Sequence, residues 1–346
     1  AANGECGAIA NRNFGTLNPG LSYSDELLND LRPWDTQIGV AVQQEIVRRV
    51  SVEVQFNKRW WYGHYVTRNL AVQASNFTRY DITAPADRRL PGGGGYTISG
   101  LHDIDPVLFG VVDYQVQSAA TYGNQSQYWN GVDVTFSVRT INGATFQGGT
   151  STGQSVQDFC EVAAKVPESL VPPQTVAIGV SIPGPTGLGV AQSGSMPTQY
   201  CHLASGFLTQ FRGIGSYLIP KIDVEVSAAL QSKPGVQLAA NYNVPAAVVA
   251  QSLGRAPSGG VANVTVNLIA PGTLYGDRIN QLDLRVAKLL RFAGTRTKLS
   301  VDLYNALNSA AVLIYNQTYS PATSTWLTPT SVLGARIAKI GATFDF

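Results

Sequence analysis

The sequence predicts an all-β protein, an antiparallel transmembrane β-barrel with short turns at one end and long loops at the other. Three observations lead to this prediction. Apolar and polar residues alternate with a period of two, the alternating segments are longer than ordinary strands, and the connections between them are tight and long in turn. Charged residues make up only 13% of the chain, about half of their usual share in soluble domains.

The alternation is clearest from Val50, where apolar residues at 50, 52, 54 and 56 oppose polar residues at 51, 53, 55 and 57. The same pattern recurs at 132–139, 222–227 and 299–303. With their neighbours, these segments predict nine strands, near 36–46, 50–66, 125–139, 144–158, 204–219, 222–240, 280–292, 296–309 and 334–346. Many of them exceed the roughly nine to eleven residues that a tilted strand needs to cross a bilayer.

The connections alternate in length. Those at 47–49, 140–143, 220–221 and 293–295 are tight, whereas those near 67–124, 159–203, 241–279 and 310–333 are long and rich in Gly, Pro, Asn and Ser. In outer-membrane barrels the short turns are periplasmic and the long loops are extracellular. We therefore expect residues 1–35 to form an extracellular segment and residues 36–346 to form barrel strands. Because the first and ninth strands would both run toward the periplasm, at least one further strand is expected upstream.

Two of the three cysteines bracket a loop-like stretch. Cys160 and Cys201 enclose a segment rich in Pro, Gly and Ser, so a disulfide at the base of that loop is predicted for an oxidising compartment. Two free thiols are the alternative. Cys6 has no predicted partner in the chain.

Several function classes find no support in the residues. The net charge of +2 is spread along the chain, so no nucleic-acid partner is predicted. No apolar run reaches the roughly 18 residues of a membrane helix, so any membrane span must consist of strands. Gly149–Gly153 matches the G-x-S-x-G pattern, but no helix follows it. His64, His102 and His202 are too dispersed for a catalytic triad or a metal site. No enzyme activity, catalytic residue, metal ligand or cofactor is predicted.

Aromatic residues in the predicted loops are the preferred candidates for ligand contacts, because their rings can stack on a sugar or on a chelate ring. They are Tyr96, Tyr114, Tyr122, Tyr315, Tyr319 and Trp326. Polar residues on the predicted inner wall are expected to solvate a lumen or to face a plug. They are Glu53, Asp133, Arg139, Asp223, Glu225, Asp283, Arg285 and Asp302.

The last residues resemble a known assembly signal. In RIAKIGATFDF, the residues Phe346, Phe344 and Ile340 share one face, which is similar to the signal that the outer-membrane barrel-assembly machinery reads. Upstream, NQLDLRVAKLLRF and TKLSVDLYNALN resemble the closing hairpin of TonB-dependent receptors, with the family's motif at Leu303, Tyr304, Asn305 and Asn308.

The resemblance extends over nearly the whole chain. Residues 36–60 and the segments WNGVDVTFSVR and LPGGGGYTI resemble large receptor-like barrels of acidobacteria that carry an N-terminal carboxypeptidase-regulatory-like domain. It implies the C-terminal portion of a barrel of about twenty-two strands, in the outer membrane of a Gram-negative cell. The implied function is the uptake or binding of a nutrient without chemistry. The implied partners are outer-membrane lipid, the barrel-assembly machinery, an unknown nutrient ligand, and TonB through an upstream region absent from this sequence.

Two other readings remain open. One is a structural or surface-interaction role, in which a filament-like or adhesin-like barrel acts through its loops. The other is a soluble all-β binding module, which the apolar strand faces disfavour.

Overall fold

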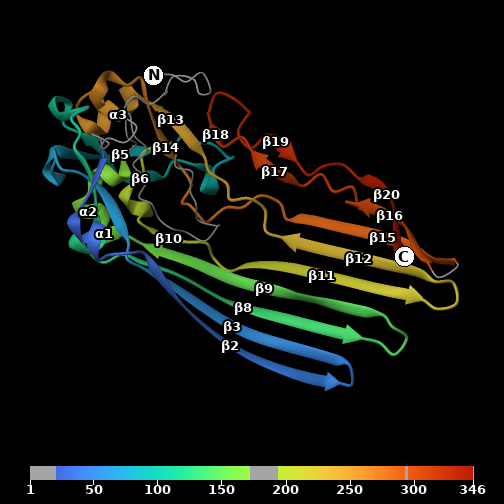
Figure 1. The fold of residues 1–346 in the computed structure, drawn as a ribbon. Coiled ribbons are helices and arrows are strands. Elements are labelled where there is room, and N and C mark those ends of the chain that lie inside the picture. Colours follow the sequence, from blue (N-terminus) through green and yellow to red (C-terminus); the bar gives the residue numbers. More distant parts are fainter. Residues whose placement is uncertain (1–20, 172–193, 293–294, 346) are drawn as a thin grey trace, which may run out of the picture.

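The computed structural model describes residues 21–171, 194–292 and 295–345, and most of the described chain is β-structure. Nine long strands lie side by side in one curved antiparallel sheet (Figure 1), the main sheet, and a short strand extends it on one of them. In spatial order, the strands are β2 (Trp34–Val47), β3 (Val50–Tyr62), β8 (Ser126–Arg139), β9 (Thr145–Asp158), β11 (Leu208–Ile219), β12 (Val224–Lys233), β15 (Ile279–Phe292), β16 (Thr295–Tyr304) and β20 (Ile337–Asp345), with β10 (His202–Ala204) on β9.

Each predicted strand corresponds to a long strand of the main sheet, but the predictions 204–219 and 334–346 begin too early, since β11 starts at Leu208 and β20 at Ile337. Three other predictions extend too far at their C-terminal ends. The prediction 50–66 is wrong beyond Tyr62, because Gly63 takes a φ of +69° and turns the chain out of the sheet. The predictions 222–240 and 296–309 are wrong beyond Lys233 and Tyr304, where a Pro-Gly pair and a left-handed Asn305 (φ 49°) follow.

One face of the main sheet is apolar and exposed. The register places Val226 between Tyr217 and Val286, and Val286 beside Val301. At the β20 edge, Ile340 lies beside Val301 and is 84% exposed. An ordinary antiparallel sheet packs such a face against a core. Within the described ranges, no element covers this one.

The tight turns lie together at one end of the main sheet (Figure 1). Arg49 and Lys221 take left-handed φ values of 72° in two of these turns, and Gly143 takes 83° in a third. The predicted tight turn at 293–295 lies largely outside the described residues. At the opposite end, the long connections begin and finish.

The long connections that were predicted as loops contain secondary structure of their own. We call residues 63–125, 159–171, 194–207, 234–278 and 305–336, together with 21–33, the loop region. Its strands are β1 (Leu21–Tyr23), β4 (Tyr65–Asn69), β5 (Phe77–Thr83), β6 (Thr97–Ile104), β7 (Tyr114–Ser118), β13 (Asn241–Pro245), β14 (Asn263–Asn267), β17 (Val312–Tyr315), β18 (Thr318–Tyr319) and β19 (Pro329–Val332).

The loop region also contains three α-helices and seven 3₁₀ turns. They are α1 (Asp25–Asn29), α2 (Cys160–Lys165), α3 (Ala246–Leu253), η1 (Ala74–Asn76), η2 (Pro91–Gly93), η3 (Pro106–Leu108), η4 (Ala119–Thr121), η5 (Pro167–Leu170), η6 (Thr198–Tyr200) and η7 (Ser258–Gly260). No helix in the described part of the chain has the length and apolarity required to cross a membrane.

Local sequence explains the longest helix, α3. Pro245 precedes its first residue, and Gly254 ends it in the left-handed conformation, with its N–H bonded to the carbonyl of Ala250. Val249 and Leu253, one helical turn apart, are its buried residues. They join a core that draws on all four long connections and includes Leu101, Leu203, Val266 and Tyr319. The loop region therefore has a hydrophobic core of its own.

The predicted extracellular segment 1–35 is only partly described. Its residues 21–33 belong to the loop region, since β1 pairs in parallel with β7. β2 already begins at Trp34. Cys6 lies outside the described residues.

Candidate functional site

The polar face of the main sheet carries a network of side chains that bond across the strands. On one half of the sheet, the Gln55 amide donates to Asn57 Oδ1 at 3.0 Å, and the Asn57 amide donates to Asp133 Oδ2 at 2.7 Å. These residues alternate with the exposed apolar ones, so they share the opposite face. The network satisfies their polar groups from within the main sheet.

Ion pairs continue this network on the other half of the sheet. Arg285 Nε lies 3.2 Å from Asp302 Oδ1, and Lys298 pairs with Glu225. Asp283 accepts hydrogen bonds from Gln281 at 3.1 Å. Five of the predicted inner-wall residues (Asp133, Glu225, Asp283, Arg285 and Asp302) therefore lie on this face with polar partners.

Two open hollows lie along the polar face. The larger, of about 940 Å³, lies near the tight turns and is lined by residues that include Glu45, Arg139, Gln147 and Glu225. The other, of about 560 Å³, lies toward mid-strand, between Asp133, Arg212 and Asp283. Their sizes fall in the range of about 300–1,000 Å³ typical of small-molecule sites. Both linings combine polar and apolar side chains.

An aromatic residue that was not among the predicted ligand contacts lies on the polar face. The Trp129 indole packs against the backbone of Gly131 and Gly153, where an added Cβ would come within 2.6 and 2.4 Å of the ring. The two glycines therefore leave the space that the indole occupies. The signal in the sequence was the position of Trp129, which lies four residues before Asp133 on β8 and therefore on the same face.

The aromatic residues expected to contact a ligand instead help to hold the loop region together. Tyr319 is 1% exposed, and its hydroxyl donates to Asp87 Oδ2 at 2.8 Å. Burial raises the pKa of Tyr319 to about 12. Trp326 is also buried, packs edge-on against Tyr319 at 5.4 Å, and donates its indole N–H to the carbonyl of Ala239.

The other four expected residues are likewise engaged. Tyr114 is buried, the Tyr96 hydroxyl donates to the carbonyl of Leu268 at 2.9 Å, and Tyr315 lies against Gly276. Tyr122 stacks on the Arg68 guanidinium, 5.3 Å from the ring centre. This packing therefore does not favour the stacking of these six rings on a ligand.

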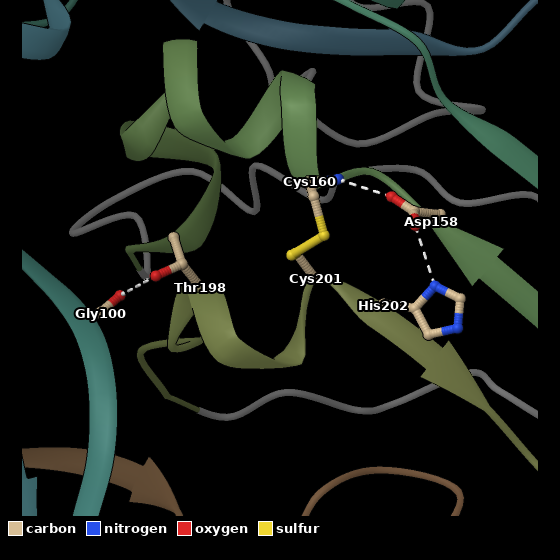
Figure 2. Close-up of a disulfide and its surroundings, with 6 residues drawn as sticks. All are labelled: Gly100, Asp158, Cys160, Thr198, Cys201 and His202. Carbon is tan, nitrogen blue, oxygen red and sulfur yellow. Dashed lines mark hydrogen bonds and ion pairs between the residues drawn. A yellow bond between two sulfur atoms is a disulfide. The ribbon is translucent and has the colours of Figure 1, made fainter.

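Cys160 and Cys201 form a disulfide, the pairing expected at the base of the second long connection (Figure 2). It joins the first residue of α2 to the residue before β10. Asp158 lies beside it, accepting from the Cys160 N–H at 3.1 Å and pairing with His202 Nδ1 at 2.9 Å. Thr198 reaches across to the carbonyl of Gly100 on β6.

The remaining motifs are dispersed. Ser151, the central residue of the G-x-S-x-G pattern, lies within β9 opposite Asp133 and Gln210. On β20, Phe344 and Ile340 are exposed on the apolar face. Phe346 lies outside the described residues.

Comparison with known proteins gives no match, since no family model, curated protein or solved structure is significantly similar to this chain.

Proposed function

We propose that this chain is the C-terminal wall of an outer-membrane β-barrel that resembles TonB-dependent receptors, and that the barrel takes up or binds a nutrient without chemical conversion. The observation that supports this proposal is the two-sided main sheet. Its apolar face is exposed, and its polar face is hydrogen-bonded and hollowed. A bilayer on one side and a hydrated lumen on the other would satisfy both faces.

Aromatic side chains at the loop end of the apolar face support the same arrangement. Trp34 stacks on Tyr62 at 4.2 Å, and Lys58 Nζ lies 4.8 Å from the Trp60 ring and 5.3 Å from the Tyr128 ring. Trp and Tyr collect at membrane interfaces because one part of the ring is apolar and the other is polar. In this proposal, the cluster lies at the outer surface of the membrane.

The proposal requires strands that pair with the two edges of the main sheet. Among the described residues, no strand pairs with the free edge of β2 or of β20. Unpaired edges favour association, so strands outside this sequence would close the barrel. The proposed partners are lipid, the assembly machinery that reads the last strand, TonB through a region outside this sequence, and a nutrient held by the polar face.

The same free edges favour one alternative, a structural role in which copies pair edge to edge in a surface assembly. A folded loop region with its own core would then be the exposed adhesive part. Electron microscopy of the native protein distinguishes the two, because a regular filament supports the alternative and a single closed barrel supports uptake.

A matched pair of lysine substitutions tests the membrane arrangement. Val226 and Ser227 are neighbours on β12 whose side chains point to opposite faces. In the complete protein, Val226→Lys should cost about 2–4 kcal/mol of folding free energy in liposomes, whereas Ser227→Lys should cost much less. Equal costs would contradict the assignment of the apolar face to lipid.

A growth experiment tests the uptake function. A source strain that lacks the gene should fail to grow on at least one sole source of iron or carbon, and a TonB-deficient strain should show the same defect. Growth on every source, together with loss of a surface assembly, would contradict uptake and support the structural alternative.

A further inference from the structure

The hollow of about 560 Å³ on the polar face, here called the central hollow, has small residues at its base. Gly149 lies between Thr135 and Arg212 on the neighbouring strands, and an added Cβ there would come within 2.2 Å of the carbonyl oxygen of Val134. On β12, Ala229 presents a methyl group to the same hollow. The longer side chains around these two residues therefore form the rim of a recess in the polar face.

The rim carries one positive and two negative side chains that are not paired with one another. Arg212, Asp133 and Asp283 form no ion pair within the described ranges. Arg212 is exposed, and the hydrogen bond that its guanidinium makes there is a contact of 3.4 Å with Gln210. A guanidinium carries several N–H donors in a planar fork. Most donors of Arg212 are therefore free to bind an occupant of the hollow.

The two carboxylates differ in how much of their hydrogen-bonding capacity is used. Asp283 accepts from the Gln281 amide and from the backbone N–H of Asn305. Asp133 accepts from Asn57 at 2.7 Å, through Oδ2. An ionised carboxylate offers about four acceptor positions. In the described chain, Asp133 Oδ1 has no hydrogen-bond partner and is not buried, so it is accessible to a ligand.

The register of the main sheet sets the separation of the two free charges. Asp133 pairs with Ser151, and Ser151 pairs with Gln210, which lies two residues before Arg212. The backbone positions of Asp133 and Arg212 are therefore roughly 10 Å apart across the strands and roughly 7 Å apart along them. An extended tripeptide spans about 10 Å, which is the scale of this offset. A single amino acid carries both of its charges on one carbon and is shorter than the offset.

An aliphatic side chain also projects into the central hollow. Ile214 lies two residues after Arg212 on the same strand face, next to Ala229, and it is 58% exposed. Contact with an apolar group of a ligand would remove this surface from water, which is favourable. The hollow therefore suits a solute that combines two opposite charges with an aliphatic part.

We propose that the central hollow binds a short zwitterionic peptide, with the peptide carboxylate on Arg212, its ammonium group on Asp133 and an apolar side chain on Ile214. This inference rests on the proposed uptake function and names the class of nutrient. Amide and hydroxyl groups of the lining are placed to bond to the peptide backbone. They belong to Thr135, Gln147, Ser151, Gln210, Gln231 and Gln281.

Isothermal titration calorimetry of the complete, detergent-solubilised protein with the tripeptide Ala-Leu-Ala tests the proposal. The N-acetylated tripeptide and the C-terminal amide serve as matched ligands, because each lacks one of the two charges. Each derivative should bind about tenfold more weakly than Ala-Leu-Ala, the loss expected for one hydrogen bond between charged groups.

Variants of the protein assign each charge of the peptide to its partner. Arg212→Gln should bind Ala-Leu-Ala and its amide with equal affinity, and Asp133→Asn should bind Ala-Leu-Ala and its acetylated form with equal affinity. The control is Arg139→Gln, which removes an arginine from the other hollow of the polar face. It should keep both differences. No binding of Ala-Leu-Ala, or binding by the parent protein that depends on neither charge, would overturn the proposal.

The comparison of Val226→Lys with Ser227→Lys separates failure of this inference from failure of the proposed function. Unequal costs of the two lysines, together with no binding of Ala-Leu-Ala, would overturn the peptide inference and leave uptake of another nutrient in place. Equal costs would overturn both, because the polar face would then not line a lumen.

Discussion

Arg68 on β4 and Glu168 in η5 form a buried ion pair, with Arg68 Nε 3.3 Å from Glu168 Oε1. Their side chains are only 14% and 7% exposed. The pair joins the connection after β3 to the connection after β9. Burial raises the pKa of Glu168, and Arg68 opposes this shift. The carboxylate also accepts from the N–H of Asn69 at 3.4 Å.

Glu168→Gln should destabilise the loop region by about 2–4 kcal/mol, because it leaves the Arg68 charge buried without a counter-ion. Urea unfolding, followed by hydrogen exchange of β4 and β7, measures this cost. The double variant Arg68→Met with Glu168→Leu should recover most of the loss, since two apolar groups need no counter-charge. A double variant as unstable as Glu168→Gln would contradict the assignment.

Loss of the disulfide should loosen the second long connection. The disulfide closes a loop of 41 residues. Because it restricts the unfolded chain, it should stabilise the fold by about 4 kcal/mol. Replacing Cys160 and Cys201 with serine should expose the segment around α2 to proteases while the main sheet stays resistant. Limited proteolysis followed by mass spectrometry measures the cleavage rate of each segment. Equal cleavage rates in both proteins would argue against a stabilising role.

The contact between Trp129 and Gly153 predicts that the polar face has no room for a side chain at position 153. Gly153→Ala should cost about 1–3 kcal/mol, because the added Cβ displaces the indole. Tryptophan fluorescence should shift at the same time. Ser151→Ala, two residues earlier on the same strand face, serves as control and should leave both quantities nearly unchanged. If Trp129→Ala does not relieve the cost of Gly153→Ala, the contact is not its cause.

Acidification should destabilise the loop region through its buried histidines. Burial is the largest cause lowering the pKa of His102, followed by the charge of Arg79, and burial also lowers the pKa of His64. Between the unfolded pKa near 6.5 and the lower folded pKa, the unfolded chain binds more protons, so stability falls as pH falls.

The measurement is the melting temperature of the loop region between about pH 7 and pH 5. His102→Gln should flatten the profile relative to the parent, because it removes one of the two histidines with a lowered pKa. An identical slope in both proteins would show that His102 does not contribute to the pH dependence. Glu168 has the opposite sign, since its raised pKa favours folding at low pH.

The strands of the main sheet were predictable because alternation is a local property. Val50 to Phe56 read as a strand without knowledge of any neighbour, and the tight turn at 47–49 joins this strand to its partner β2. The loop region was not predictable in this way. Its core joins Leu101, Val244 and Tyr319 from three different connections, and no local pattern relates them.

The candidate site shows the same limit. Tyr319 and Trp326 were expected to face a ligand because they are aromatic and lie in a long connection. They are buried because segments distant in sequence cover them. Trp129 was overlooked because the glycines that accommodate it, Gly131 and Gly153, lie on two strands and become neighbours only in the sheet.

The links within the loop region also determine how the molecule responds to a mechanical load. The Arg68 to Glu168 pair links the segments that leave the main sheet after β3 and after β9, and the Cys160 to Cys201 disulfide closes the connection between β9 and β11. Tension applied to the loop region is therefore shared among β3, β8 and β9, which bond to one another along their lengths. Strands loaded in parallel resist shear together. An external force is therefore resisted by the hydrogen bonds of several strands and does not peel away a single hairpin.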